Sequence, residues 1–353
     1  MAFEDELLDL KYMSEKFNLI PEPQLFAAKM VYNKKVNPGV DDIILPYLTG
    51  HKNIAELVPY EAEGETVSLP TPEIRRIHEI FLSKPQTILD PKQLRKKITP
   101  GTNPIDTGGR TPNAVEAYIL DQWTELKNQC ATRHEWLRWQ AFTGQLTYTN
   151  PKGNWSVNYN LPGTHATAHD WTNIAADIYA DIQADAQLIS DDCGEAPNLL
   201  LLGSTCCDNL MNTTKFQTVQ TWPKAVYDTG SQWNIQGINP AMGCQLVAKG
   251  WQGMDVYRMT GTWWNGATFS PYLDPMFYVM LANQNPRRPF IEFWCPVYDR
   301  IDGRDVWYTG DYNPYTFSTK KSHPNIEGIQ VLSCMFPYPA DMNTIVCCDT
   351  NAA

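Results

Sequence analysis

The sequence predicts an α+β fold that combines one long helix with β-hairpins and a second region of mixed helix and strand. Three features predict it: helical spacing from Thr111 to Gly144, an alternating hairpin pattern directly after it, and a helix-then-strand pattern from Trp171 onward. The 353 residues are 43% hydrophobic and 12% aromatic, which is typical of a folded chain with a sizeable core. Length alone allows one large domain or two to three smaller ones.

The chain begins with a charged stretch that runs to about Phe26 and contains Pro21 and Pro23. Prolines at this spacing favour an extended or partly helical arm that leaves the body of the protein.

A long hairpin arm is expected next, between Pro46 and Pro85. Val58 to Val67 reads as a strand, an acidic turn and a returning strand. Neither face of such an arm has enough apolar residues for an independent core. The arm therefore either folds onto its own domain or pairs with a neighbouring subunit. The second interpretation predicts contacts between subunits at Glu61, Glu63, Gly64, Glu65, Arg75 and Arg76.

The clearest helix begins at Thr111-Pro112, where Thr can cap free amides and Pro suits the first helical position, and ends at Gly144. It would be on the order of 45 Å long. Its expected core face carries Val115, Ile119, Trp123, Leu126, Cys130, Leu137 and Ala141, and the charged residues Glu116, Asp121, Glu125, Lys127 and Arg138 are placed elsewhere.

Strands follow this spine helix. Leu146–Thr149 and Trp155–Leu161 alternate large with small polar residues around the turn 150–153, so they predict a hairpin that covers the helix. From Trp171, a four-residue apolar step predicts an acidic helix that Gly194 ends, and Leu199–Leu202 a buried strand. Further strands are expected at 244–248, 255–259, 276–281, 290–294, 329–333 and 344–348, with a loop over 300–325 and a proline corner at 336–339.

Charge and cysteine usage exclude several classes of protein. The net charge of −11 disfavours direct nucleic-acid readout, which relies on attraction to phosphates. No apolar run of about 18 residues occurs, and the first residues are acidic rather than basic then apolar, so we expect a cytosolic product. The nine cysteines are odd in number and lack a CxxC pair, which favours free buried thiols over disulfides or zinc.

Few motifs point to chemistry. His165, His169 and Asp170 could hold a metal if helical, but Pro162 and Gly163 favour a linker there. Ser204 follows a strand, as a nucleophile would, but GxSxG is incomplete, and capping of a helix by Ser204 or Thr205 is the better interpretation. The aromatic residues Tyr257, Trp263, Trp264, Phe269 and Tyr272 suit a core or a subunit interface better than base stacking, because Lys and Arg are sparse around them.

The segment 131–147, ATRHEWLRWQAFTGQLT, resembles the lambda-type major capsid proteins of tailed phages, the capsid E family. The resemblance extends over 57–85, 154–161, 176–191, 198–203 and 272–281, in order along nearly the whole chain. It implies the Hong Kong 97-like fold: an N-terminal arm (1–39), an extended loop (40–92), a peripheral domain (93–165 and 326–353) and an axial domain (170–325). The 300–325 stretch has no counterpart in the lambda pattern.

The resemblance also implies a non-enzymatic shell subunit, without catalytic residues, metal or cofactor, that assembles in the host bacterial cytoplasm and ends in the virion. Its main partner would be itself, in hexamers and pentamers. A portal, a scaffold or protease and a cement protein are further expected partners, and double-stranded DNA is enclosed without sequence-specific binding. Two rival functions remain open: an encapsulin-like compartment shell, and a soluble metal-dependent hydrolase that uses His165, His169 and Asp170.

Overall fold

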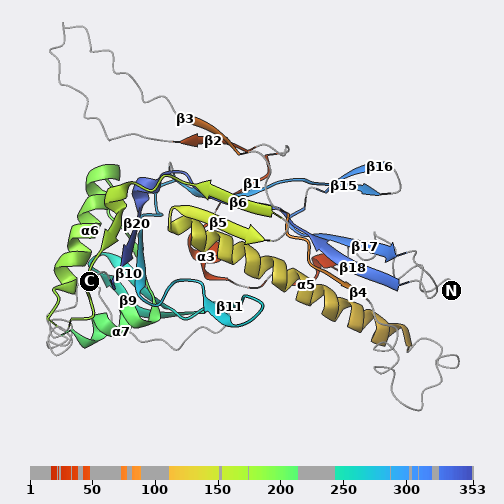
Figure 1. The fold of residues 1–353 in the computed structure, drawn as a ribbon, viewed down its shortest axis with the longest axis horizontal. Helices are drawn as coiled ribbons and strands as arrows, with labels where there is room; N and C mark the ends of the chain where they lie inside the picture. The colour runs from red at the N-terminus through yellow and green to blue at the C-terminus, as the bar shows by residue number, and fades with distance from the viewer. Residues whose placement is uncertain are drawn as a thin grey trace, which may run out of the picture.

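The computed structural model of the protein describes residues 17–21, 23, 25–32, 34–38, 43–47, 73–77, 82–88, 111–150, 153–173, 175–213, 243–286, 288–301, 304–308, 310–319 and 326–351. Figure 1 shows an elongated body with the long helix α5 lying along it. A mixed sheet with α6 and α7 stands at one end of α5, and the strands β15 to β18 lie toward the other end.

Helix α5 (Thr111–Phe142) is unbroken, as its sequence predicts. Gly144 ends it with a φ of +78°, a conformation that glycine adopts without strain. The helix packs against β5, β18, β19 and the short helix α3 (Phe26–Met30). Its second half is enclosed on several sides, so Lys127 and Arg138, which the sequence places away from the core, are buried there.

The largest sheet among the described residues has six strands in the order β7-β20-β13-β8-β10-β9. The strands are β7 (Ala166–Ala168), β8 (Leu199–Leu202), β9 (Cys244–Trp251), β10 (Met254–Met259), β13 (Phe277–Leu281) and β20 (Ile345–Asp349). The pairs β8–β10 and β7–β20 are parallel, and the other neighbours are antiparallel. The predicted strands at 199–202, 244–248, 255–259, 276–281 and 344–348 are therefore confirmed.

Each face of this sheet is buried against different elements. Leu200 and Leu202 of β8 join a core with helices α6 (Ile178–Cys193) and α7 (Ser204–Asn212). Leu199 and Leu201 point the other way and join a core with the last turns of α5. Because successive side chains of a strand alternate, the continuous leucine run fits a strand that is covered on both faces. Gly194 ends α6 in the left-handed conformation, as expected.

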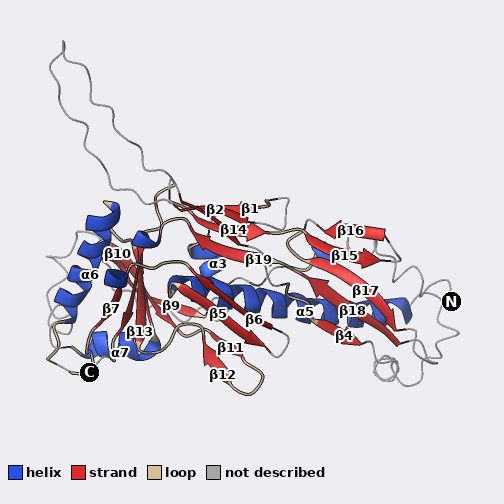
Figure 2. Cartoon of the chain, turned by 45° about the horizontal axis from the view of Figure 1, so that its top comes forward, coloured by secondary structure: helices blue, strands red, loops and turns tan. Residues whose placement is uncertain are grey.

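Two three-stranded sheets contain the strands that precede and follow the extended hairpin in the sequence, β1 and β4. One has the order β1-β14-β19, with β1 (Lys34–Val36) parallel to β14 (Phe290–Trp294). The other has the order β17-β18-β4, in which β17 (Asn313–Thr319) and β4 (Gln86–Ile88) each pair antiparallel with the central strand β18 (Ile326–Leu332). Figure 2 shows both sheets lying along α5.

Four two-stranded antiparallel sheets and two short helical turns complete the described part of the chain. The hairpin β5 (Gln145–Asn150) with β6 (Gly153–Asn158) packs on α5, as predicted, and its register places Leu146 opposite Val157 and Tyr148 opposite Trp155. The remaining pairs are β2 (Ile43–Tyr47) with β3 (Glu73–Ile77), β11 (Thr262–Trp264) with β12 (Phe269–Pro271), and β15 (Val297–Ile301) with β16 (Arg304–Tyr308). Single turns of 3-10 helix lie at Gly163–His165 and Met342–Thr344.

Two interpretations of the C-terminal third are wrong. The 300–325 stretch is not a loop, because β16 and β17 run through it. The Asp302-Gly303 sequence between two strands is a hairpin signal, which is hard to recognise in a stretch of such polar composition. The segment 336–339 is not a corner but part of strand β19 (Met335–Pro339), which pairs with β14. Since β19 lies at the edge of its sheet, Pro337 and Pro339 can point their N positions away from the partner strand without losing a ladder hydrogen bond.

The N-terminal stretch also differs from its prediction. In the described part, Phe17 and Phe26 do not leave the body but are buried, Phe17 against Trp123 and Phe26 against Trp139 of α5. Burial of two Phe side chains, worth about 1.5–3 kcal/mol each, explains why this segment stays on the helix. Among the described residues, no helix is both long and apolar enough to cross a membrane.

Candidate functional site

The N-terminal segment is fastened to α5 through Glu135. This buried carboxylate accepts hydrogen bonds from the backbone N–H of Ala27 at 2.7 Å and of Ala28 at 3.3 Å, in the first turn of α3. Leu25, the N-cap residue of α3, makes no side-chain cap, so Glu135 supplies the missing acceptors from another helix. Trp139 donates to the same carboxylate from Nε1 at 3.0 Å.

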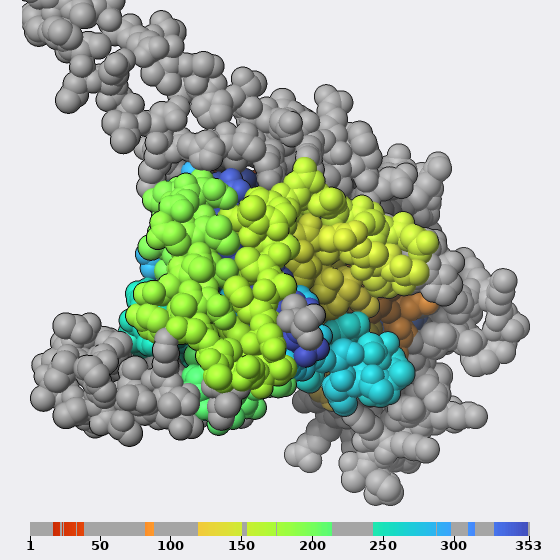
Figure 3. All heavy atoms as spheres, turned by 60° about the vertical axis from the view of Figure 1, so that its left-hand side comes forward, coloured from red at the N-terminus to blue at the C-terminus, as the bar shows by residue number. Residues whose placement is uncertain are grey.

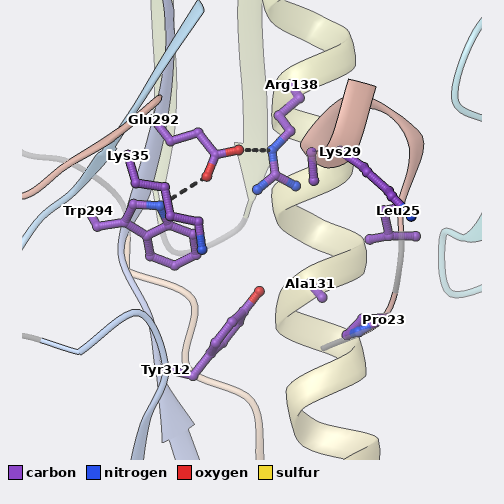
Figure 4. Close-up of a pocket in the computed structure, with 10 residues that line it drawn as sticks. Pro23, Leu25, Lys29, Lys35, Ala131, Arg138, Glu292, Trp294 and Tyr312 are labelled. Carbon is purple, nitrogen blue, oxygen red and sulfur yellow. Dashed lines mark hydrogen bonds and ion pairs between the residues drawn. The ribbon is translucent and has the colours of Figure 1, made fainter. Parts of the chain in front are cut away.

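Arg138 links this helix to strand β14. Its Nε donates to Glu292 Oε1 at 2.8 Å (Figure 4). Its Nη1 lies 3.3 Å from Glu135 Oε2. Trp294 donates to the other oxygen of Glu292 at 3.0 Å. Burial alone would lower the pKa of Arg138, but Glu292 and Glu135 hold that pKa above its ordinary value. A buried cation between two buried anions is therefore fully paired, which is the condition for such charges to be tolerated.

His134 lies beside this network. Its ring stacks on Tyr312, meets Trp294 edge-on, and has Nε2 3.4 Å from Ser333 Oγ. Burial lowers the pKa of His134 well below 6.5, and the charges of Arg138, Lys35 and Arg133 lower it further. The imidazole is therefore neutral at physiological pH.

A pocket of about 330 Å³ lies between the N-terminal segment and β14, and Figure 4 shows its lining. Two of its cations already have anionic partners: Arg138 is paired as described, and Lys35 pairs with Asp311 at 2.8 Å and lies over the Trp294 ring. The pocket is a gap between packed elements that these ion pairs hold together. Its described lining residues include no arrangement of nucleophile and base.

The extended hairpin is anchored to the body at both ends. On the N-terminal side of the hairpin, strand β1 pairs with β14. On its C-terminal side, Ser83 forms a bridge with Ser333, and β4 pairs with β18. Between these anchors, β2 and β3 pair antiparallel from Ile43–Ile77 to Tyr47–Glu73. Arg75 and Arg76 lie in β3, where only the backbone is described. The expected contact residues Glu61, Glu63, Gly64 and Glu65 lie outside the described residues.

The residues expected in the core of the spine helix lie as follows. Ile119, Trp123 and Leu126 are buried together with Phe17, Ile329 and Val331. Leu137 is buried in the larger core that faces the six-stranded sheet. Val115 lies in α5, but its side chain is outside the description.

The structure gives His165, His169 and Asp170 different partners. His165 is buried and bonds Ile345 O and Asp192 Oδ2, both at 2.8 Å, whereas Asp170 Oδ1 accepts from the Thr172 hydroxyl and backbone N–H. Residues 166–168 between the histidines form strand β7 rather than a helix. The three side chains are thus not gathered on one helical face.

His169 instead lies near Asp185 and Cys348, and these three offer ligand atoms within 4.8 Å of one another. Asp185 Oδ2 already accepts from Thr167 Oγ1 at 2.9 Å and from the Tyr278 hydroxyl, with His169 Nε2 at 3.4 Å. Burial raises the pKa of Cys348 to about 11, so its thiol is protonated. A buried carboxylate satisfied by hydroxyl donors accounts for this cluster.

The helix start at Ser204 is also not capped as predicted. Gly203 is the N-cap residue and makes no side-chain cap; the backbone N–H of Cys206 donates to Pro275 O at 2.8 Å instead. A Cβ at Gly203 would lie 2.3 Å from Asp274 O, so only glycine allows this approach. The capping prediction for Ser204 and Thr205 is wrong because a neighbouring loop supplies the acceptor.

Sequence reasoning did not single out Glu135, Glu292 or the role of Arg138. The signal for the first of these pairs is Glu135 and Arg138 three residues apart between Trp136 and Trp139, which combines opposite charges with large aromatic residues. Glu292 stands 154 positions away from Arg138, so no local pattern points to it.

The spine helix is clamped to the N-terminal segment, the extended hairpin is anchored at both ends, and helices cover the mixed sheet. This arrangement is the Hong Kong 97-like fold. The chain belongs to the phage major capsid protein E family, whose model matches residues 9–347. The predicted fold class and family are confirmed.

Solved structures agree with this fold. One neighbour is a prophage protein of Escherichia coli CFT073 described as a capsid protein, with a TM-score of 0.67 and 15% identity over 97% of this chain and 99% of that chain. A second is a phage-related protein of Bordetella bronchiseptica RB50, with a TM-score of 0.52 and 12% identity over 97% of each chain. No curated protein matches the sequence.

Proposed function

We propose that this chain is the major capsid protein of a tailed double-stranded DNA phage, and that it assembles into the hexamers and pentamers of an icosahedral head. The observation that carries the proposal is the family match over residues 9–347. The subunit works by packing against copies of itself and performs no catalysis.

The anchored hairpin supports a mechanism for assembly. The β2–β3 ribbon is held at its base by β1 and β4, and a two-stranded ribbon is marginally stable by itself in water. A neighbouring subunit would supply the missing partner surface. The tip residues Glu61, Glu63, Gly64 and Glu65, with Arg75 and Arg76 on β3, are the proposed contacts.

The proposed division of labour follows the expected ranges: an arm over 1–39, an extended loop over 40–92, a peripheral domain over 93–165 and 326–353, and an axial domain over 170–325. The last two share a sheet, because β20 from the C-terminal segment pairs with β13 and with β7. Such sharing suits a subunit that must transmit strain between neighbours as one body.

The charge balance fits a container for DNA. At a net charge of −11, the subunit lacks the overall attraction to phosphates that would immobilise the genome on the shell wall. The genome is held by confinement. A portal, a scaffold or protease, and a cement protein are the proposed further partners, and the mature location is the virion.

Deletion of Glu61–Glu65 tests the proposal. The subunit should keep the circular dichroism and melting temperature of the wild type, because a two-stranded arm of this composition has too few apolar residues to form a core. Its yield of shells, measured by sedimentation and negative-stain microscopy, should fall sharply against the wild-type chain. A normal yield would remove the hairpin from the mechanism, and a wild-type chain that stays monomeric at high concentration would overturn the function itself.

Electron microscopy and content analysis of particles purified from the cells that naturally produce the chain distinguish a phage capsid from an encapsulin-like compartment. Tails and packaged DNA are expected. Tail-less particles that contain enzyme cargo would instead assign an encapsulin-like compartment. A stoichiometric metal ion in the purified chain, together with hydrolytic activity, would revive the hydrolase.

A further inference from the structure

The hairpin β11–β12 exposes two aromatic side chains to solvent. Trp264 is 54% exposed and Phe269 is 70% exposed, and they face each other across the hairpin with ring centroids 5.0 Å apart. Figures 1 and 2 show this hairpin protruding from the body beside α5, and Figure 3 shows the cyan segment to which it belongs as a lobe on the molecular surface. Burial of such large rings is the default in a monomer.

The opposite face of the hairpin is fixed to the body. Trp263 lies against Trp136 of α5, with ring centroids 6.0 Å apart. The Arg133 guanidinium lies 5.1 Å, 4.9 Å and 5.5 Å from the ring centroids of Trp136, Tyr148 and Trp263. An arginine held among three aromatic rings joins α5, β5 and β11, so the hairpin is held in place at its base.

The turn is also held in one conformation. The Asn265 side chain accepts from the backbone N–H of Ala267 and Thr268 and donates to Ser270 Oγ at 2.9 Å. A pair of aromatic rings on a rigid support loses little conformational entropy when it binds, which is the property of a preorganised contact.

The composition of the hairpin favours a protein partner. The fourteen residues from Thr260 to Leu273 include no charged side chain, in a chain that is 19% charged. Protein interfaces are depleted of charge and enriched in aromatic residues at their centre. Base stacking on single-stranded nucleic acid needs cations alongside, and the guanidinium of the nearby Arg133 already lies over three rings of the subunit itself.

We propose that Trp264 and Phe269 form a contact with a second copy of this chain in the assembled shell; the inference rests on the proposed function. Together the two side chains expose on the order of 200 Å², against about 800 Å² per partner in a standard interface. The pair is therefore an anchor within a larger contact and does not dimerise free subunits. The pair stabilises the assembled shell, in which the same contact recurs in every subunit.

The test compares the double variant Trp264→Thr/Phe269→Thr with the matched control Trp264→Phe/Phe269→Tyr. Threonine keeps the strand propensity but removes the rings, and the control keeps two aromatic rings. Both variants should melt within a few degrees of the wild type as free subunits, as expected for exposed positions. Shell yield by sedimentation should fall about tenfold or more for the threonine variant only.

A second measurement does not depend on that variant folding. Ala267→Cys places a thiol at the exposed turn, while the native cysteines are buried. Its reaction with a maleimide should be fast in free subunits and at least about tenfold slower in shells, because an adjoining copy covers the turn.

Equal labelling in shells and subunits, or normal assembly of the threonine variant, would overturn this inference alone. Absence of shells from the wild-type chain would instead overturn the proposed function. Single-stranded DNA binding by free subunits that the threonine variant loses would reassign the hairpin to nucleic acid.

Discussion

Glu135 joins three parts of the chain through one buried carboxylate, which holds the first turn of α3, Trp139 and Arg138. Glu135→Ala leaves the Arg138 charge with one partner fewer and leaves buried N–H donors without an acceptor. We expect the free energy of unfolding of the subunit to fall by about 3–5 kcal/mol, as for other broken buried pairs. Urea denaturation followed by tryptophan fluorescence measures the loss.

Glu125→Ala is the matched control for that experiment, because Glu125 lies on the exposed side of the same helix and bonds Gln129 at 3.2 Å. Its removal should change the free energy of unfolding by no more than about 0.5 kcal/mol. Similar losses for the two variants would mean that the Glu135 network does not hold the N-terminal segment.

His134 makes the stability of the subunit depend on pH. Its folded pKa lies below the ordinary 6.5, so the unfolded chain binds a proton more readily than the folded one. The stability that this residue contributes is present above pH 6.5 and is lost as the pH falls below it. The loss reaches at most about 1.4 kcal/mol per pH unit for one proton. His134→Gln, measured by denaturation from pH 7 to pH 5, should therefore show a shallower decline than the wild type. Parallel declines would exclude this residue as the cause.

At the scale of one element, the end of α5 depends on Gly144. Its φ of +78° and the 2.5 Å that would separate an added Cβ from Leu161 Cβ both oppose any side chain. Gly144→Ala should lower the melting temperature of the subunit, with at least about 1–2 kcal/mol lost to the left-handed conformation alone. Gly163→Ala is the control, because an added Cβ there has nothing within 4 Å. That variant should melt like the wild type; a comparable drop would show that the position of Gly144 is not special.

The elements that could be predicted from sequence are those whose signals are local. Helix α5 and the hairpin β5–β6 follow from periodicity over neighbouring residues, and Leu199–Leu202 from a short run of leucines. The burial of Lys127 and Arg138 could not be predicted, because their partners Ile20 O and Glu292 lie 107 and 154 positions away. Strand β19 was hidden by its prolines, which are tolerated only because the strand lies at a sheet edge.

At the scale of the whole molecule, the three hydrophobic cores formed by the described residues share their walls. Helix α5 supplies Trp123 to one core and Phe142 to the next, and the six-stranded sheet separates the second core from the third. Strand β20 shows this sharing within two neighbouring residues, since Cys347 faces one core and Cys348 the other. Loss of one core therefore removes a wall of its neighbour, so we expect the described body to unfold as one unit.

The nine cysteines report on that cooperativity, because they are all buried and are spread over the three cores and their borders. Burial raises the pKa of Cys130 and Cys347 to about 12 and that of Cys207 to about 11, so these three thiols are both shielded and protonated. A thiol reagent at pH 8 should label none of them in the folded subunit and all nine in denaturant. With increasing urea, Cys130 and Cys348 should become reactive at the same midpoint, as mass spectrometry of labelled peptides can measure. Earlier labelling of Cys130 would show that the core between α5 and the N-terminal segment opens separately, as an arm that detaches during assembly would require.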